Sequence, residues 1–217
     1  MTQSPLQLGV PVTEARVLCV FVHGRGQSPE AMRADVIRHL RTPGVAYVLP
    51  RAAAASWYGA RAVDALSDTT RAELGHSLAR LAQDIGAAQA QAPGLPLVLA
   101  GFSQGACLSL EHAFAVGPWH GALAAFTGCR VGQGADARPA ADLSGLPAYL
   151  SGSDADPWIP VQAFAEAALA LGAARARLRA DVFPGRAHQV STTEIAVLDA
   201  MLADLAAGRP IGWGQAI

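Results

Sequence analysis

The chain has 217 residues, of which 52% are hydrophobic and 15% are charged, and its formal net charge is −1. A chain of this length and composition can bury a full hydrophobic core, which excludes intrinsic disorder and predicts one folded domain over residues 1–217. The charges are balanced and form no basic stripe, so we expect no nucleic-acid partner.

The sequence also indicates a cellular compartment. Its three cysteines, Cys19, Cys107 and Cys129, lie in apolar surroundings and form no CxxC pair. This pattern argues against a disulfide framework or a zinc site and fits a reducing compartment. Residues 1–10 lack a basic stretch followed by an apolar run, and no uninterrupted apolar stretch reaches the roughly 18 residues of a membrane span. We therefore expect a cytoplasmic protein without a signal peptide or membrane span.

Short apolar runs predict the strands of a sheet. Five runs are nearly continuous, as in strands that are buried on both faces. They cover residues 17–22, 45–49, 97–102, 122–127 and 148–151. A sixth run, residues 177–183, alternates apolar and charged side chains, which predicts a strand near the edge of the sheet.

Amphipathic segments between these runs predict helices. The first helix begins after Ser28, a typical N-cap residue that precedes Pro29, and its apolar face continues to Leu40. Further helices are predicted over residues 71–90, directly after Ser103, over residues 161–171, and after a capping box at residues 191–194.

The alternation of strands and helices predicts a mostly parallel central sheet with helices on both faces. Ligands of such sheets bind beyond the carboxyl ends of the strands. Three irregular segments follow predicted strands and can line a site there: residues 51–68, 128–145 and 152–160. The second of them contains Gly132, Gly134 and Pro139 without helical periodicity, so we expect no substantial cap over the site.

The strongest chemical signal is the G-x-S-x-G motif of residues 101–105, which lies between a predicted strand and a predicted helix. This is the context of the nucleophile elbow of the α/β-hydrolase fold, where a tight turn holds a serine hydroxyl above the sheet. The glycines fit because strand and helix nearly touch on either side of the serine. The motif predicts Ser103 as the nucleophile.

A serine nucleophile needs a base and an orienting acid. His188 lies in the loop between the last predicted strand and the last predicted helix, and it fits the chain order Ser, Asp, His of this fold. Asp154 and Asp156 share one loop after a strand, and spacing alone does not decide which of them is the acid.

Acyl transfer also needs donors for the developing oxyanion. One is expected to be the backbone N–H of Gln104, directly after the nucleophile, and the other a main-chain group of residues 23–26. The same loop contains His23, for which we expect a role in holding the loop rather than in catalysis.

Together these residues resemble the phospholipase/carboxylesterase family, the acyl-protein thioesterase-like branch of the α/β-hydrolases. The resemblance extends over residues 17–205. Its anchors are residues 23–26, 56–58, 101–106, 154–160 and 185–188. It implies that the acid is the aspartate directly before proline, which is Asp156, and that the second oxyanion donor is Arg25.

Two positions depart from the family pattern. The histidine loop usually reads Gly-Met-x-His, whereas this chain has Arg186 beside the base, where it is expected to affect the leaving group. The bulky Trp158 follows the acid loop's Asp-Pro pair. We expect Trp158 to bind substrate and to limit the acyl chain. Trp57 and Tyr58 either bind substrate as well or pack their own loop.

The resulting prediction is a serine hydrolase that cleaves carboxylic esters of short to medium acyl chain, with no metal and no cofactor. Family members act on such esters, on lysophospholipids or on protein-bound acyl thioesters, so an acyl-protein thioesterase or lysophospholipase with the same triad is the alternative. A hydrolase-like protein that only binds a ligand is a further alternative. The apolar tail, residues 210–213, can cover its own domain or a second copy in a homodimer.

Overall fold

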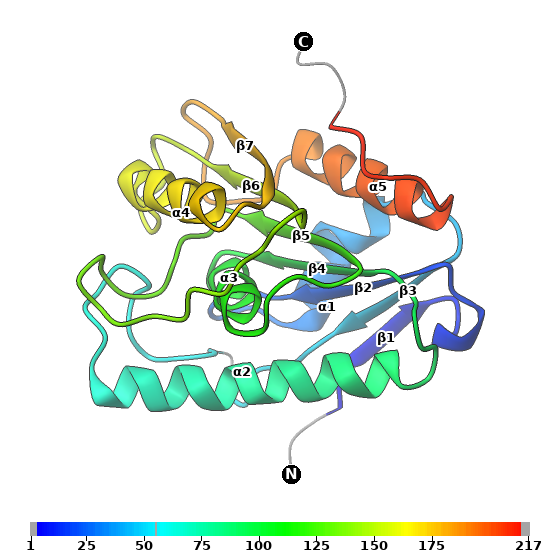
Figure 1. The fold of residues 1–217 in the computed structure, drawn as a ribbon, viewed down its shortest axis with the longest axis horizontal. Coiled ribbons are helices and arrows are strands. Elements are labelled where there is room, and N and C mark those ends of the chain that lie inside the picture. Colours follow the sequence, from blue (N-terminus) through cyan, green and yellow to red (C-terminus); the bar gives the residue numbers. More distant parts are fainter. Residues whose placement is uncertain (1–3, 55, 214–217) are drawn as a thin grey trace.

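The computed structural model describes residues 4–54 and 56–213, and the described part of the chain forms one seven-stranded sheet (Figure 1). The strand order is β1-β3-β2-β4-β5-β6-β7. The strands are β1 (Leu6–Gly9), β2 (Val17–Val22), β3 (Val45–Leu49), β4 (Leu97–Phe102), β5 (Gly121–Phe126), β6 (Pro147–Gly152) and β7 (Arg177–Val182). Neighbouring strands run parallel except β1 and β3, which are antiparallel. The predicted mostly parallel sheet is confirmed.

Helices cover both faces of this sheet. They are α1 (Pro29–Asp35), α2 (Asp68–Gln89), α3 (Gln104–Val116), α4 (Val161–Ala173) and α5 (Thr192–Ala206), with short 3-10 helices at η1 (Val12–Glu14) and η2 (Ile37–His39). Helices α2, α3 and α4 pack on one face, whereas α1 and α5 pack on the other (Figure 1). None of the helices in the described ranges is both long and apolar enough to cross a bilayer.

The two cores explain the continuous apolar runs in the sequence. In β2, Leu18 and Val20 point into the core under α2 and α3, whereas Cys19 and Phe21 point into the core under α1 and α5. Successive side chains of a strand point to opposite faces, so a strand covered on both faces needs an apolar residue at every position. Strand β7 is half exposed and lies at the sheet edge, as its alternating pattern predicted.

Two element boundaries differ from the sequence prediction by three residues or more. Helix α1 ends at Asp35, because Val36 leaves the helical conformation with φ −127°, and the chain continues as the 3-10 helix η2. Helix α2 begins at Asp68, three residues before the predicted start, because the side chain of Ser67 accepts a hydrogen bond from the N–H of Thr70. The predicted capping box of α5 is present.

The described segment between β5 and β6, residues 127–146, contains no helix, so the expected absence of a substantial cap at this place is confirmed. The tail packs within its own chain. Ile211 is buried in the core under α5, and its carbonyl accepts a hydrogen bond from Arg177. The carbonyl of Trp213 accepts one from Arg179.

The contact between α3 and β2 depends on a glycine and gives a first test. A Cβ added to Gly105 would lie 2.2 Å from the carbonyl oxygen of Val22, which is main chain and cannot rotate away. We expect Gly105→Ala to lower the free energy of unfolding by about 1–3 kcal/mol or more, as overpacking does. Urea unfolding followed by circular dichroism measures the change.

Gly75 in α2 is the matched control, because a Cβ there would meet no atom within 4 Å. Gly75→Ala is expected to raise the free energy of unfolding by about 0.5–1 kcal/mol, the usual gain for alanine over glycine inside a helix. Equal effects of the two substitutions would contradict the close approach of α3 to β2.

Candidate active site

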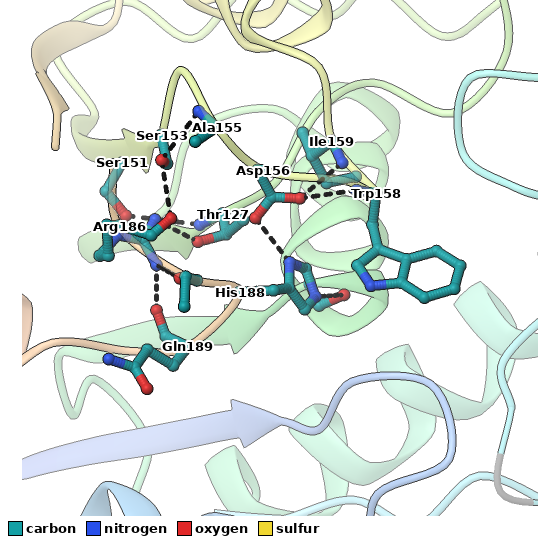
Figure 2. Close-up of polar contacts among 12 residues, drawn as sticks. Thr127, Ser151, Ser153, Ala155, Asp156, Trp158, Ile159, Arg186, His188 and Gln189 are labelled. Atoms are coloured by element: carbon teal, nitrogen blue, oxygen red, sulfur yellow. Dashed lines mark hydrogen bonds and ion pairs between the residues drawn. The ribbon is translucent and has the colours of Figure 1, made fainter. Parts of the chain in front are cut away.

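Three loops bring a serine, a histidine and an aspartate together at the carboxyl ends of the strands. Ser103 joins β4 to α3, Asp156 lies between β6 and α4, and His188 lies between β7 and α5. Oγ of Ser103 is 2.8 Å from Nε2 of His188. Nδ1 of His188 is 2.6 Å from Oδ2 of Asp156 (Figure 2). In this arrangement the imidazole can accept the serine proton, and the carboxylate can stabilise the imidazolium that results.

The serine is held in a backbone conformation that few residues adopt. Ser103 has φ 55° and ψ −121°, in the half of conformational space that side chains disfavour. Such a conformation costs about 1–3 kcal/mol and persists only where the surroundings enforce it. They do so here because a Cβ on Gly101 would lie 2.5 Å from the backbone of Gly105, so strand and helix meet without side chains.

The structure separates the two aspartates that the sequence left open. Asp156 is buried, and its Oδ1 accepts hydrogen bonds of 2.8 Å from the backbone N–H groups of Trp158 and Ile159, which leaves Oδ2 for His188 (Figure 2). Asp154 instead accepts a 2.7 Å hydrogen bond from the N–H of Gly185. Asp154 therefore ties the acid loop to the histidine loop and does not contact the imidazole.

His23 holds the loop that follows β2. Its Nδ1 donates to the carbonyl of Gly24 at 2.8 Å, and its Nε2 accepts from the N–H of Ala52 at 3.2 Å. Burial lowers the pKa of His23, which favours the neutral ring that these two contacts require. The backbone carbonyl of His23 accepts a 2.8 Å hydrogen bond from Nε1 of Trp57, a residue 34 positions further along the chain.

A cavity of about 330 Å³ lies over the serine. Ser103, His188, Arg25 and Gln104 line it, together with the predicted substrate-binding residues Tyr58 and Trp158. Tyr58 is buried, whereas Trp158 stands at the mouth with 58% of its surface exposed. Trp57 is not among the lining residues. It is buried against His23, with the two ring centroids 4.9 Å apart, so it packs its own loop.

The side chain of Gln104 has a role that the sequence reasoning missed. Its Oε1 accepts a 2.9 Å hydrogen bond from the N–H of Trp57, and its Nε2 donates to the carbonyl of Tyr58 at 2.8 Å. Gln104 thereby fixes residues 57 and 58, of which Tyr58 lines the cavity. In the sequence, the only indication of this role was the glutamine itself, between the serine and the last glycine of the G-x-S-x-G motif.

Cys107 and Cys129 are buried free thiols whose sulfur atoms are 4.0 Å apart, and Cys107 lines the cavity. Arg186 is also buried, and its guanidinium donates to Oγ1 of Thr127 at 2.7 Å instead of facing the cavity (Figure 2). The expectation that Arg186 affects the leaving group directly therefore has no support in its position.

The fold is that of the α/β-hydrolases. The chain belongs to the phospholipase/carboxylesterase family, whose model matches residues 9–205. The family resemblance seen in the sequence is thus confirmed. No curated protein matches the chain.

Solved structures show the same similarity. A phospholipase/carboxylesterase from Dyadobacter fermentans is 29% identical, with 93% of this chain and 96% of that chain covered and a TM-score of 0.83. Acyl-protein thioesterase 2 from Zea mays is 16% identical, with 95% and 100% covered and a TM-score of 0.71. A carboxylesterase from Mesorhizobium loti is 19% identical, with 92% and 93% covered and a TM-score of 0.69.

The contacts of the two aspartates predict different effects on ester turnover. Asp156→Asn is expected to lower kcat by about 10⁴-fold, because an amide in place of the carboxylate favours the wrong imidazole tautomer and removes the charge that stabilises imidazolium. Asp154→Asn is the matched control on the same loop, and it loses only a contact to Gly185. Hydrolysis of p-nitrophenyl butyrate measures both. A larger loss at Asp154 would reverse the assignment of the acid.

Proposed function

We propose that this protein hydrolyses carboxylic esters of short to medium acyl chain through an acyl-enzyme on Ser103. The observation that carries the proposal is the pair of contacts that link Ser103, His188 and Asp156, at 2.8 and 2.6 Å, on the floor of a cavity. A hydroxyl within hydrogen-bond distance of a base, which is itself oriented by a third group, is the arrangement of an activated nucleophile.

The chemistry proceeds in two steps. His188 accepts the hydroxyl proton as Ser103 attacks the ester carbonyl, and the imidazolium then donates that proton to the departing alcohol. The acyl group is left on Ser103 Oγ. In the second step His188 accepts a proton from water, which attacks the acyl-enzyme, and the serine leaves with that proton while the carboxylic acid is released.

The oxyanion of each tetrahedral intermediate would be bound by the backbone N–H groups of Arg25 and Gln104. Gln104 is the first residue of α3, and the first N–H groups of a helix have no acceptor within it. The helix N-terminus also favours negative charge. The side chain of Arg25 donates to the carbonyl of Gly59 at 2.8 Å and also to that of Ala60, which supports holding its loop in place over the serine.

The size of the cavity supports a short to medium acyl chain. Its volume of about 330 Å³ is near the lower end of the roughly 300–1,000 Å³ that small-molecule sites have. Trp158 stands at its mouth, and the segment after β5 supplies no helix to cover a longer chain. Each methylene that stays in water forgoes about 0.8 kcal/mol of transfer free energy.

A second candidate is an acyl-protein thioesterase. The open site and the exposed Trp158 favour it, because a bulky protein-bound acyl group needs access that a covered site would deny. The same three residues would cleave a thioester. Comparison of an acyl thioester with the oxoester of equal chain length decides between the two, since the preferred substrate has the higher kcat/KM.

Ser103→Ala tests the function itself. We expect turnover of p-nitrophenyl butyrate to fall by about 10⁶-fold, because no group replaces the hydroxyl. A fluorophosphonate probe should label the native protein at one site and leave the variant unlabelled. A native protein that neither turns over the ester nor reacts with the probe would indicate a protein that binds a ligand without cleaving it. A variant that keeps its turnover would rule out Ser103 as the nucleophile.

Trp158→Ala tests the proposed limit on chain length. A panel of p-nitrophenyl esters from acetate to palmitate should show kcat/KM of the native enzyme rising and then levelling off at a modest length. In the variant, kcat/KM should continue to rise with chain length, because each additional methylene that is buried contributes about 0.8 kcal/mol of transfer free energy. Tyr47→Phe, on the far side of the sheet from the cavity, is a control that should leave the length profile unchanged. A native preference for very long chains, unchanged in Trp158→Ala, would refute this role.

A further inference from the structure

A buried ion pair lies beneath the histidine loop. The side chains of Arg186 and Glu194 are 6% and 0% exposed, and the nearest nitrogen and oxygen are 3.7 Å apart. Removing charges from water is costly, so a buried pair needs close compensation and further hydrogen bonds. The contacts of these two side chains therefore show what the pair holds in place.

The guanidinium of Arg186 is surrounded by the loop that carries His188. It donates to the carbonyl of Ala187 at 3.2 Å and also to the carbonyl of Gln189 (Figure 2). These residues directly precede and follow His188. The loop thus curls around the guanidinium, and the backbone on both sides of the imidazole is fixed to one rigid, planar group.

The same residue connects this loop to the supports of the other two triad members. The guanidinium donates to Oγ1 of Thr127 at 2.7 Å, directly after Phe126, whose carbonyl accepts a 2.9 Å hydrogen bond from the N–H of Ser103. The backbone carbonyl of Arg186 accepts a 2.8 Å hydrogen bond from Ser153, on the loop of Asp156 (Figure 2).

Glu194 compensates the buried cation and is itself anchored. Its carboxylate accepts hydrogen bonds from Oγ of Ser151 at 2.5 Å and from the N–H of Ser191 at 2.6 Å. Ser151 lies in β6 and Ser191 caps α5, so the carboxylate is fixed to the sheet and to the helix at once. Arg186 is thereby held against β6 and the start of α5.

We propose that Arg186, compensated by Glu194, is a positioning residue for His188: it fixes the imidazole at hydrogen-bond distance from both Ser103 and Asp156. The proposal rests on the proposed function, because it assigns a catalytic consequence to the position of His188. A displacement of about 1 Å in an active site can lower the rate about 100-fold, so a group that fixes this loop acts on kcat without touching the substrate.

Arg186→Met tests the proposal. We expect kcat for p-nitrophenyl butyrate to fall by about 10- to 100-fold while KM stays within about twofold, because the imidazole is displaced but the cavity is not. The substitution also leaves Glu194 as a lone buried charge, which lowers the melting temperature. All variants are therefore assayed at a temperature at which circular dichroism shows them folded.

Two further variants separate position from stability. Arg186→Met with Glu194→Gln removes both charges and is expected to recover much of the melting temperature while kcat stays low. Arg186→Lys keeps the charge but has no planar fork to hold several carbonyl groups at once, so it should recover stability more than kcat. If Arg186→Met does not fold, these two variants decide the question.

Arg130→Met is the matched control. Arg130 and Glu111 form another buried pair, 7% and 1% exposed and 2.6 Å apart, that holds no triad loop. This variant should lose stability as Arg186→Met does and keep its kcat. Equal losses of kcat in the two variants, or native kcat in Arg186→Met or in the double variant, would overturn the positioning role. A native protein that neither turns over esters nor reacts with fluorophosphonate would instead overturn the proposed function, and the positioning role with it.

Discussion

The left-handed backbone at Ser103 is the constraint on which the rest of the site depends. It exists because β4 and α3 meet at Gly101 and Gly105, where a Cβ on either residue would collide with main chain. Helix α3 begins directly after Ser103, and its first residue, Gln104, lines the same cavity as the serine. The positions of the proposed nucleophile and of Gln104, one of the two candidate oxyanion donors, are therefore consequences of one packing contact.

The parallel sheet brings Asp156 and His188 close to Ser103 with short loops. Strands β4, β5, β6 and β7 lie next to one another in that order, and their carboxyl ends meet at one edge. Ser103, Asp156 and His188 each need only a short loop from this edge to come within hydrogen-bond distance. Longer loops would lose more conformational entropy on ordering. This strand order therefore lowers the entropic cost of holding the three side chains together.

Local features were predictable from the sequence, whereas contacts between distant loops were not. The elbow motif and the capping box at Ser191 depend on neighbouring residues, so their patterns were sufficient. Strand β1 was missed because it has only four residues and is half exposed, which leaves little apolar signal. Spacing could not separate Asp154 from Asp156, because their partners lie about 30 residues further along the chain.

The inward direction of Arg186 was unpredictable for the same reason, since arginines are mostly exposed and its partners outside its own loop, Thr127 and Glu194, lie on two other segments. Trp57 shows the converse. An aromatic residue beside the site was a reasonable candidate to bind substrate, yet its indole N–H is satisfied by the carbonyl of His23. A buried polar group takes whatever partner the fold offers, and the sequence does not name that partner.

The absence of a helix between β5 and β6 has a consequence for the fate of the acyl-enzyme. An intermediate in a covered site can be shielded from solvent long enough for a second alcohol or amine to accept the acyl group. Here residues 127–146 contain no helix that could form such a cover, so bulk water would reach the ester carbonyl of the proposed acyl-enzyme. Under the proposed mechanism, this open edge would let water reach the acyl group as readily as a second alcohol or amine, which favours release of the acid.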